Sequence, residues 1–146
     1  MKHLFIYILG IGLFLIGCDV ETSDNGKLDG YWHLTRVDTL ATGVSSDLSG
    51  TRIFWGIQMN LIQAVDHDHD EGHYGYLFNF EHKDNILRLY NAHKHERRDG
   101  DPLVEDVEVL TSLGINALDA VFTIEKLSNN DMVLKDDMFR LWFEKM

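Results

Sequence analysis

The chain has 146 residues, a formal net charge of −11 and a single cysteine, Cys18. Excess negative charge repels nucleic-acid phosphates and anionic lipid headgroups, so the composition argues against nucleic-acid partners and against electrostatic docking to membranes. One cysteine excludes an intrachain disulfide, so a packed core must stabilise the fold, and the length suits one domain.

The chain begins with a short apolar run at residues 4–16, which follows Lys2 and ends in the sequence Leu-Ile-Gly-Cys at Cys18. The run is shorter than the ~20 residues of a membrane-spanning helix, and its basic start is typical of a cleaved signal. The segment resembles the signal peptides of bacterial lipoproteins, which are cut before a cysteine that receives lipid. The resemblance implies a lipoprotein signal peptide over residues 1–17 and a lipid-anchored mature chain that begins at Cys18.

The next segment, residues 18–28, is polar and has no apolar area to bury, so it is predicted to be a flexible tether. Its acidic residues Asp19 and Glu21 resemble lipoprotein sorting signals, which retain some proteins at the inner membrane and export others. We expect a location in the bacterial cell envelope, at the outer membrane or cell surface in preference to the inner membrane.

The remaining residues, 29–146, alternate apolar and polar side chains with a period of two, which predicts β-strands. Residues 51–65 are predicted to form one long strand, with Trp55 and Met59 on its apolar face. Further strands are expected at residues 31–38, 74–80, 86–90, 104–110, 122–124, 132–134 and 139–143. Only residues 111–119 look briefly helical.

Eight short strands joined in series can close into an up-and-down β-barrel, which leaves no exposed sheet edge. The predicted fold class is therefore all-β, an eight-stranded antiparallel up-and-down barrel with a short helical turn near residues 111–119. A two-layer β-sandwich is the alternative closure of the same strands.

The sequence Gly-Tyr-Trp at residues 30–32 opens the first strand and looks like the Gly-x-Trp signature of lipocalins and related calycins. In that family a basic residue in the last strand covers the tryptophan. The first and last strands of a closed barrel are neighbours, which favours Lys145 over Arg140 as this cation. The domain thus resembles small lipocalin-like bacterial lipoproteins, in which Gly30, Trp32 and Lys145 would close one end of the barrel.

A lipocalin-like barrel implies an interior site for a small hydrophobic or amphipathic molecule. The side chains expected to line it are Trp55, Ile57, Met59, Tyr76, Phe78, Phe80, Leu87, Leu89, Leu141 and Phe143. The same large side chains could instead fill the barrel. The second hypothesis is therefore an interaction protein that presents loops, such as residues 39–50, to an envelope partner. No catalytic motif with supporting context is present, so neither enzymatic activity nor a cofactor is expected.

The loop at residues 66–73 reads Asp-His-Asp-His-Asp-Glu-Gly-His and is the most unusual in the chain. Counting strands places it beside Trp32, with the loops at residues 94–102 and 128–130. The loops at residues 39–50, 83–85, 111–119 and 135–137 would gather at the opposite, open end. Candidate ligands for zinc or another divalent ion would then share the rim beside the tryptophan: His67, His69, His73, His93 and His95. No spacing imposes a coordination geometry, so a solvated acidic loop is the preferred interpretation and no metal is expected.

Overall fold

The computed structural model describes residues 23–69 and 74–146. Within these ranges eight strands form the wall of a barrel, and a ninth short strand, β2 (Ser45–Asp47), lies outside it. The wall consists of β1 (Gly30–Thr39), β3 (Ile53–Gln58), β4 (Leu61–Asp66), β5 (Tyr76–Lys83), β6 (Ile86–Lys94), β7 (Ala120–Leu127), β8 (Asp131–Lys135) and β9 (Phe139–Lys145).

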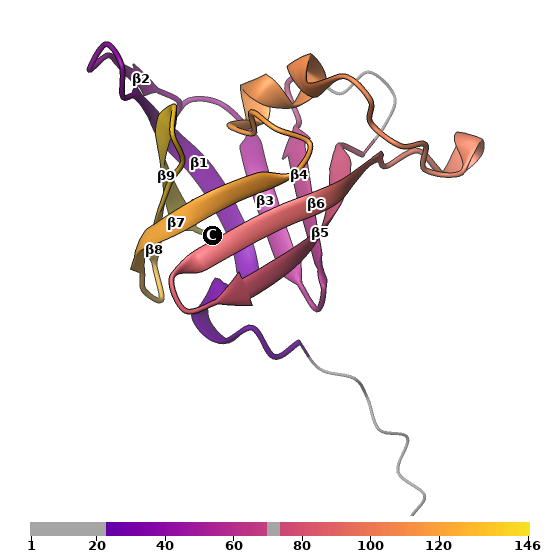
Figure 1. Ribbon diagram of the computed structural model, residues 1–146, viewed down its shortest axis with the longest axis horizontal. Helices are drawn as coiled ribbons and strands as arrows, with labels where there is room; N and C mark the ends of the chain where they lie inside the picture. Colours follow the sequence, from indigo (N-terminus) through magenta and orange to yellow (C-terminus); the bar gives the residue numbers. More distant parts are fainter. Residues whose placement is uncertain (1–22, 70–73) are drawn as a thin grey trace, which may run out of the picture.

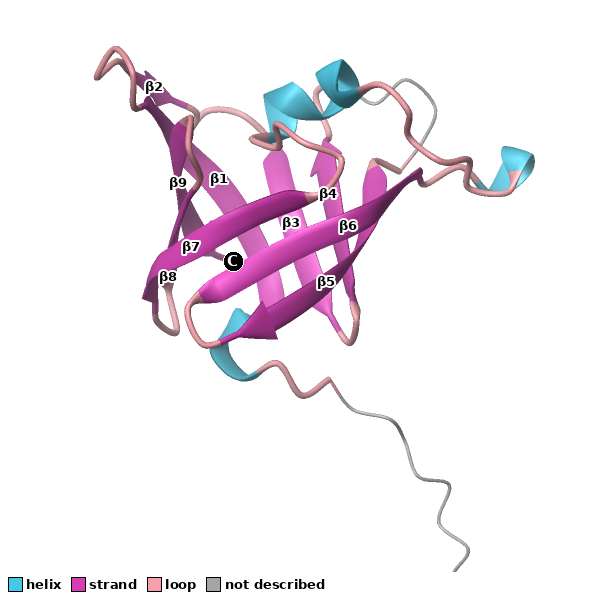
Figure 2. Cartoon of the chain, viewed as in Figure 1, coloured by secondary structure: helices cyan, strands magenta, loops and turns pink. Residues whose placement is uncertain are grey.

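The wall is a closed antiparallel ring, because each strand pairs with the next along the chain and β9 pairs with β1 (Figure 1). This arrangement confirms the predicted all-β, up-and-down barrel and excludes the β-sandwich. Short 3₁₀ helices lie outside the wall: η1 (Gly26–Leu28), η2 (Arg97–Asp99) and η3 (Val107–Leu113) (Figure 2). Over the described ranges, no helix has the length and apolar character needed to cross a bilayer.

The segment predicted as one strand at residues 51–65 is a hairpin, in which β3 and β4 are joined by a tight turn. Met59 occupies that turn with φ 54°, a left-handed conformation that glycine or asparagine usually supplies. The apolar alternation of the sequence runs on through Met59, and this continuity hides the turn.

The prediction of a strand at residues 104–110 is also wrong, because residues 107–113 form the 3₁₀ helix η3. Asp106 begins the helix by accepting a hydrogen bond from the Glu108 backbone N–H, and Gly114 ends it with φ 85°. Its buried residues, Leu110 and Leu113, are three apart, which is the period of a 3₁₀ helix. The short helix therefore begins earlier than predicted. Because one predicted strand is absent here and another proved to be two strands, the barrel still has the predicted number of strands.

The missed hairpin reverses the predicted direction of the next two strands, so the loops between residues 66 and 102 change ends. The loop after β4, which carries His67 and His69, lies at the end of the barrel opposite Trp32, together with the loops that follow β1, β6 and β8. The β5–β6 turn at residues 84–85 lies at the Trp32 end. The predicted position of the histidine loop beside Trp32 is therefore wrong.

The Trp32 end of the barrel is closed from below by η1. Leu28 is fully buried, and the Trp32 indole Nε1–H donates a hydrogen bond of 2.9 Å to its carbonyl oxygen. The Lys145 ammonium lies 4.7 Å from the centre of the Trp32 ring, a cation–π distance, and donates to the Lys27 carbonyl oxygen. A single side chain thus ties the last strand to both the tryptophan and the N-terminal segment.

The position of Lys145 depends on Gly30, whose φ is 143°. A Cβ at residue 30 would lie 2.9 Å from Cε of Lys145 and would displace its side chain. Arg140, the other basic residue of β9, forms an ion pair with Glu125 on the outer wall. Lys145 is therefore the cation at the indole face.

The N-terminal segment is docked on the barrel from Ser23 onward. The Asp29 carboxylate accepts hydrogen bonds from the Ser23 hydroxyl at 2.6 Å and from the Asn25 side chain at 2.7 Å. Because Leu28 is buried in the core, the flexible tether predicted over residues 18–28 does not extend to residue 28.

Candidate binding site

The predicted interior site is filled by the side chains that were expected to line it. The fully or almost fully buried members of the set are Trp55, Ile57, Phe78, Leu87, Leu89, Leu141 and Phe143, none more than 2% exposed. A void wide enough for water would leave accessible area on the side chains around it, so these side chains pack against one another and line no such void. Tyr76 and Phe80 are half-buried at the margin of this core.

Met59 does not face the interior. Its side chain is 44% exposed because the β3–β4 turn carries it outside the wall. The prediction that Met59 lines the barrel is therefore wrong, for the same reason that the long strand was wrong.

Aromatic rings occupy the centre of the barrel. The Trp55 ring meets Phe143 at 4.9 Å between centroids and Phe122 at 5.8 Å, the latter edge to face. Such pairs add about 0.5–1.5 kcal/mol beyond the burial of their area. Aromatic rings thus pack against one another within the mainly aliphatic core of the described residues.

The end opposite Trp32 is closed by η3 and the residues that follow it. Leu110, Leu113 and Ile115 are buried there, and the Trp55 indole Nε1–H donates a hydrogen bond of 3.0 Å to the Leu113 carbonyl oxygen. Gly114 makes the close approach possible, because a Cβ at this residue would lie 2.9 Å from a methyl carbon of Leu141. An indole therefore ties a covering segment to the core at each end of the barrel.

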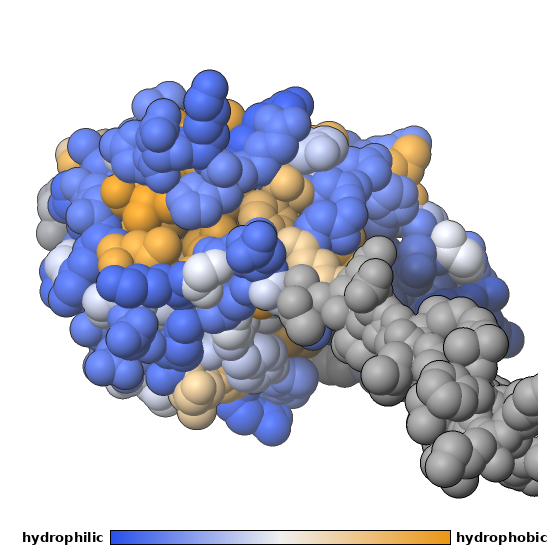
Figure 3. All heavy atoms as spheres, turned by 90° about the horizontal axis from the view of Figure 1, so that it is seen from below, coloured by the Kyte–Doolittle hydropathy of each residue, from blue (hydrophilic) through white to orange (hydrophobic). Residues whose placement is uncertain are grey.

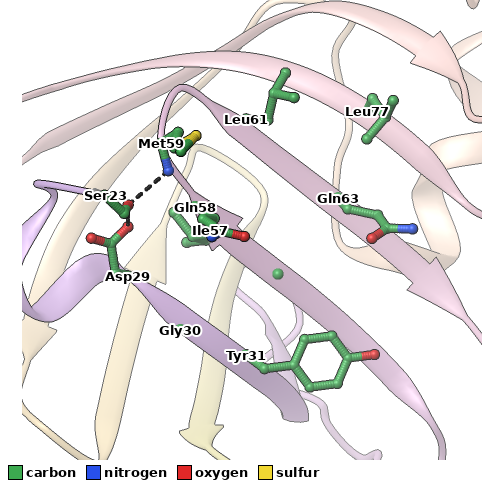
Figure 4. Close-up of a pocket in the computed structure, with 11 residues that line it drawn as sticks. Ser23, Asp29, Gly30, Tyr31, Ile57, Gln58, Met59, Leu61, Gln63 and Leu77 are labelled. Atoms are coloured by element: carbon green, nitrogen blue, oxygen red, sulfur yellow. Dashed lines mark hydrogen bonds between the residues drawn. The ribbon is translucent and has the colours of Figure 1, made fainter. Parts of the chain in front are cut away.

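A hollow of about 700 Å³, here called the outer groove, lies on the outer wall of the barrel across β1, β3, β4 and β5. In the strand register Gly56 lies between Tyr31 and Gln63, and Gln63 pairs with Leu77. Gly56 has no side chain, and the Tyr31 ring lies beside it, 3.3 Å from the position that a Cβ would take. Figure 4 shows Tyr31 on one side of the groove and Leu61, Gln63 and Leu77 on the other. The groove is lined by Ser23, Asp29, Gly30, Tyr31, Gly56, Ile57, Gln58, Met59, Leu61, Gln63 and Leu77.

A smaller hollow of about 290 Å³ continues along the wall toward β6 and shares Leu61 and Leu77 with the outer groove. Its other described lining residues come from β5, from β6 and from the segment after η2: Phe78, Asn79, Asn91, His93, Gly100 and Asp101. The two leucines thus form an apolar ridge between two concave areas.

Backbone strain is concentrated around these two hollows. Among the described residues, the non-glycine residues with positive φ are Met59, Asp84, Asn91 and Asp101, and all except Asp84 line one hollow or the other. Asparagine and aspartate tolerate this conformation, but methionine does not favour it. Strained residues of this kind gather at functional sites, which supports a binding role for this wall.

The electrostatics of the outer groove disfavour anions. Its described lining contains an acid, Asp29, and no lysine or arginine. Burial raises the pKa of Asp29, but hydrogen bonds from Ser23 and Asn25 outweigh this effect and hold the pKa below its ordinary value. Burial also raises the pKa of Tyr31, which therefore stays neutral. A ligand that fits this lining is neutral or cationic.

The candidate histidines do not form one cluster. His67 Nε2 lies 2.9 Å from the Tyr31 hydroxyl, and His69 pairs with Asp66 at 2.9 Å. His93 contacts the Asn91 carbonyl oxygen, whereas His95 contacts the Gln63 amide and the Tyr74 ring. His73 lies outside the described residues. Across residues 23–69 and 74–146, no three His, Cys, Asp or Glu side chains are grouped so as to hold a metal ion.

Comparison with known proteins agrees with this architecture. A family model described as a lipocalin-like domain matches residues 13–146. This chain belongs to the lipocalin-like family. A crystal structure of a lipocalin-like protein from Bacteroides uniformis is similar to it with a TM-score of 0.63 and 21% identity, covering 83% of this chain and 100% of that one.

An uncharacterized protein from Bacteroides eggerthii has a similar structure, with a TM-score of 0.61 and 18% identity over 81% of this chain and 98% of that one. Identities this low establish the shared fold alone. No curated protein matches the chain. The lipocalin-like barrel is compatible with binding of a small molecule, and members of this family are generally non-catalytic.

Proposed function

We propose that this protein is a lipid-anchored, non-catalytic protein of the bacterial envelope that binds a small neutral amphipathic molecule in the outer groove. The observation that carries this proposal is a solid barrel interior beside an open hollow of about 700 Å³ on the wall. Small-molecule sites typically occupy about 300–1,000 Å³ and combine apolar walls with a few polar groups.

The groove offers both kinds of surface. Leu61 and Leu77 supply aliphatic contact, and the Tyr31 ring supplies a flat wall that is already fixed by stacking on Phe54, 4.7 Å between centroids. The Gln63 amide is fixed as well, because its Nε2–H donates to the Tyr74 carbonyl oxygen. Walls that are already ordered lose little conformational entropy when a ligand binds.

Attachment to the membrane rests on the lipoprotein-like signal that ends at Cys18. One acyl chain alone gives marginal membrane binding, and two or more give a durable anchor. The acidic residues after Cys18 resemble sorting signals of both kinds, and the position we propose is the outer membrane or cell surface. Such a protein would keep its ligand at the envelope without transforming it.

The test is a titration of the unlipidated chain, begun at residue 19, with the neutral fluorescent probe N-phenyl-1-naphthylamine. Gly56→Val places a side chain 3.3 Å from the Tyr31 ring and so displaces one wall of the groove. We expect it to weaken probe binding at least about tenfold, which corresponds to 1.4 kcal/mol. Gly50→Val is the matched control, because a Cβ at Gly50 meets nothing within 4 Å.

Equal binding by the wild type, Gly56→Val and Gly50→Val would reject the groove as the site. Failure of the wild type to bind would favour the second candidate, an interaction protein with a filled barrel. One observation supports that candidate independently: the segment after β1, which includes β2, is exposed at every residue from 41 to 47, and Val44 in its loop is 58% exposed. A solvent-exposed apolar residue on a protruding loop is suited to contact a partner protein.

A further inference from the structure

The Met59 turn, residues 58–61, places a non-glycine residue in a left-handed backbone conformation without burying its side chain. Met59 adopts φ 54°, which costs an L-residue roughly 1–2 kcal/mol relative to the right-handed conformation. Met59 is 44% exposed and Leu61 is 42% exposed, so neither residue recovers this cost through burial. An exposed apolar side chain on a strained turn therefore points to a partner.

The N-terminal segment holds this turn in place through both of its backbone polar groups. The Met59 backbone N–H donates to the Ser23 hydroxyl oxygen at 2.7 Å, a bond drawn in Figure 4. The Met59 carbonyl oxygen accepts from the Asn25 side-chain amide at 2.7 Å. Asp29 binds both Ser23 and Asn25, so the turn and the segment form one unit.

The length of chain before Ser23 sets how far this unit can lie from the membrane. Five peptide units separate Cys18 from Ser23. An extended chain spans at most about 3.6 Å per residue, so Ser23 lies within roughly 18 Å of the lipidated residue. Ser23 contacts Met59 directly, so the Met59 turn lies within reach of the proposed anchor.

The other turns at this end of the barrel have a different character. Residues 84–85 are Asp-Asn and residues 128–130 are Ser-Asn-Asn, all of which favour water. Seen from below, this end shows apolar patches between predominantly hydrophilic residues (Figure 3). Ile86 and Met146 are exposed at this end as well, but among these apolar residues Met59 is the one that Ser23 of the N-terminal segment contacts directly.

We propose that the Met59 turn contacts a neutral lipid surface, with Met59 and Leu61 inserted at the boundary between headgroups and acyl chains. The proposal rests on the lipid anchor of the proposed function. The formal charge of −11 repels anionic headgroups, which is why the lipid is neutral. Since Met59 and Leu61 also line the outer groove, the groove opens at the membrane and its ligand is a neutral amphiphile of the lipid layer.

The test uses the full lipidated protein in vesicles of zwitterionic phosphatidylcholine that carries bromine on its acyl chains. Met59→Cys is labelled with an environment-sensitive nitrobenzoxadiazole dye, which the lipidated Cys18 cannot take up. Asn129→Cys on a polar turn at the same end is the matched control. Insertion to about 5–10 Å, typical of interfacial contacts, predicts quenching at position 59 at least about twice that at position 129.

A second variant separates membrane contact from folding. Met59→Gly relieves the strained φ, so the protein should melt at the same or a higher temperature. In a Leu61→Cys labelled protein, the same substitution should lower quenching by the brominated lipid. Vesicle flotation with equal quenching at positions 59 and 129 would overturn the contact and leave the anchor intact. A protein that does not float with the vesicles would overturn both the anchor and this inference, whereas groove binding is tested separately by Gly56→Val.

Discussion

Trp55→Phe should loosen the cover at the η3 end of the barrel. The substitution removes the indole N–H that binds the Leu113 carbonyl oxygen at 3.0 Å and leaves this buried oxygen without that donor. An unsatisfied buried acceptor costs about 1–3 kcal/mol, and the smaller ring adds a void worth roughly 1 kcal/mol. We therefore expect a loss of about 2–4 kcal/mol, a large part of the 5–15 kcal/mol typical of a domain.

The assay is a thermal melt combined with native-state hydrogen exchange. For a domain of this size, about 4 °C per kcal/mol predicts a fall in Tm of roughly 8–16 °C. The backbone N–H groups of Gly114 and Ile115, which bind carbonyl oxygens within η3, should lose protection before the strands do. Trp142→Phe is the control for exchange at residues 114–115, because its indole binds Asp38 and makes no hydrogen bond to η3. An unchanged Tm with unchanged exchange at residues 114–115 would refute the idea that Trp55 holds η3.

Two other substitutions test different parts of the fold. Gly75→Ala should sharply reduce the yield of folded protein, because φ is 81° and the new Cβ would collide with a backbone carbonyl oxygen of β4. Gly43 has a similar φ of 71° but lies in open space. Gly43→Ala should therefore lower the free energy of unfolding by only about 1–2 kcal/mol, measured in a urea titration. Burial raises the pKa of Asp38, but hydrogen bonds from Ser45, Arg36 and Trp142 outweigh it and lower the pKa below its ordinary value. The pKa of Asp38 is therefore lower in the folded than in the unfolded protein. The ionised carboxylate stabilises the fold above about pH 3.9, and this stabilisation is lost as the pH falls through the folded pKa. Asp38→Asn should therefore lower the free energy of unfolding at pH 6 and converge with the wild type in acid; a constant difference down to pH 2 would contradict this origin.

The strands were predictable because one face of each is buried, which imposes a period of two on the sequence. The ends of the strands were less predictable than the strands themselves. Met59 continues the apolar alternation through a turn, and only its exposure in the folded chain reveals the hairpin. In an up-and-down barrel every strand reverses direction, so one missed turn exchanges the ends of all loops until a second error restores the count. His67 and His69 were misplaced in this way.

The candidate site was less predictable than the fold, and for a different reason. Alternation correctly places Trp55, Phe78 and Phe143 inside, but it does not give the volume they must fill. Whether a barrel is hollow depends on the sum of its inward side chains and on what covers its ends. A signal for the outer groove was present in the sequence as Gly56, an isolated glycine within a strand, which marks a missing side chain on the solvent face.

A packed interior and the binding site that we propose on the wall follow from one energetic constraint. A cavity in the core costs about 24 cal/mol per Å³, so even a 300 Å³ ligand site would cost roughly 7 kcal/mol when empty. That is comparable to the whole stability of a domain, and this chain has no intrachain disulfide to offset it. The outer groove is open to solvent and interrupts none of the contacts among Trp55, Phe122 and Phe143. A stable barrel of this size can therefore keep an open groove on its outer wall, where the proposed anchor would also hold it close to lipid.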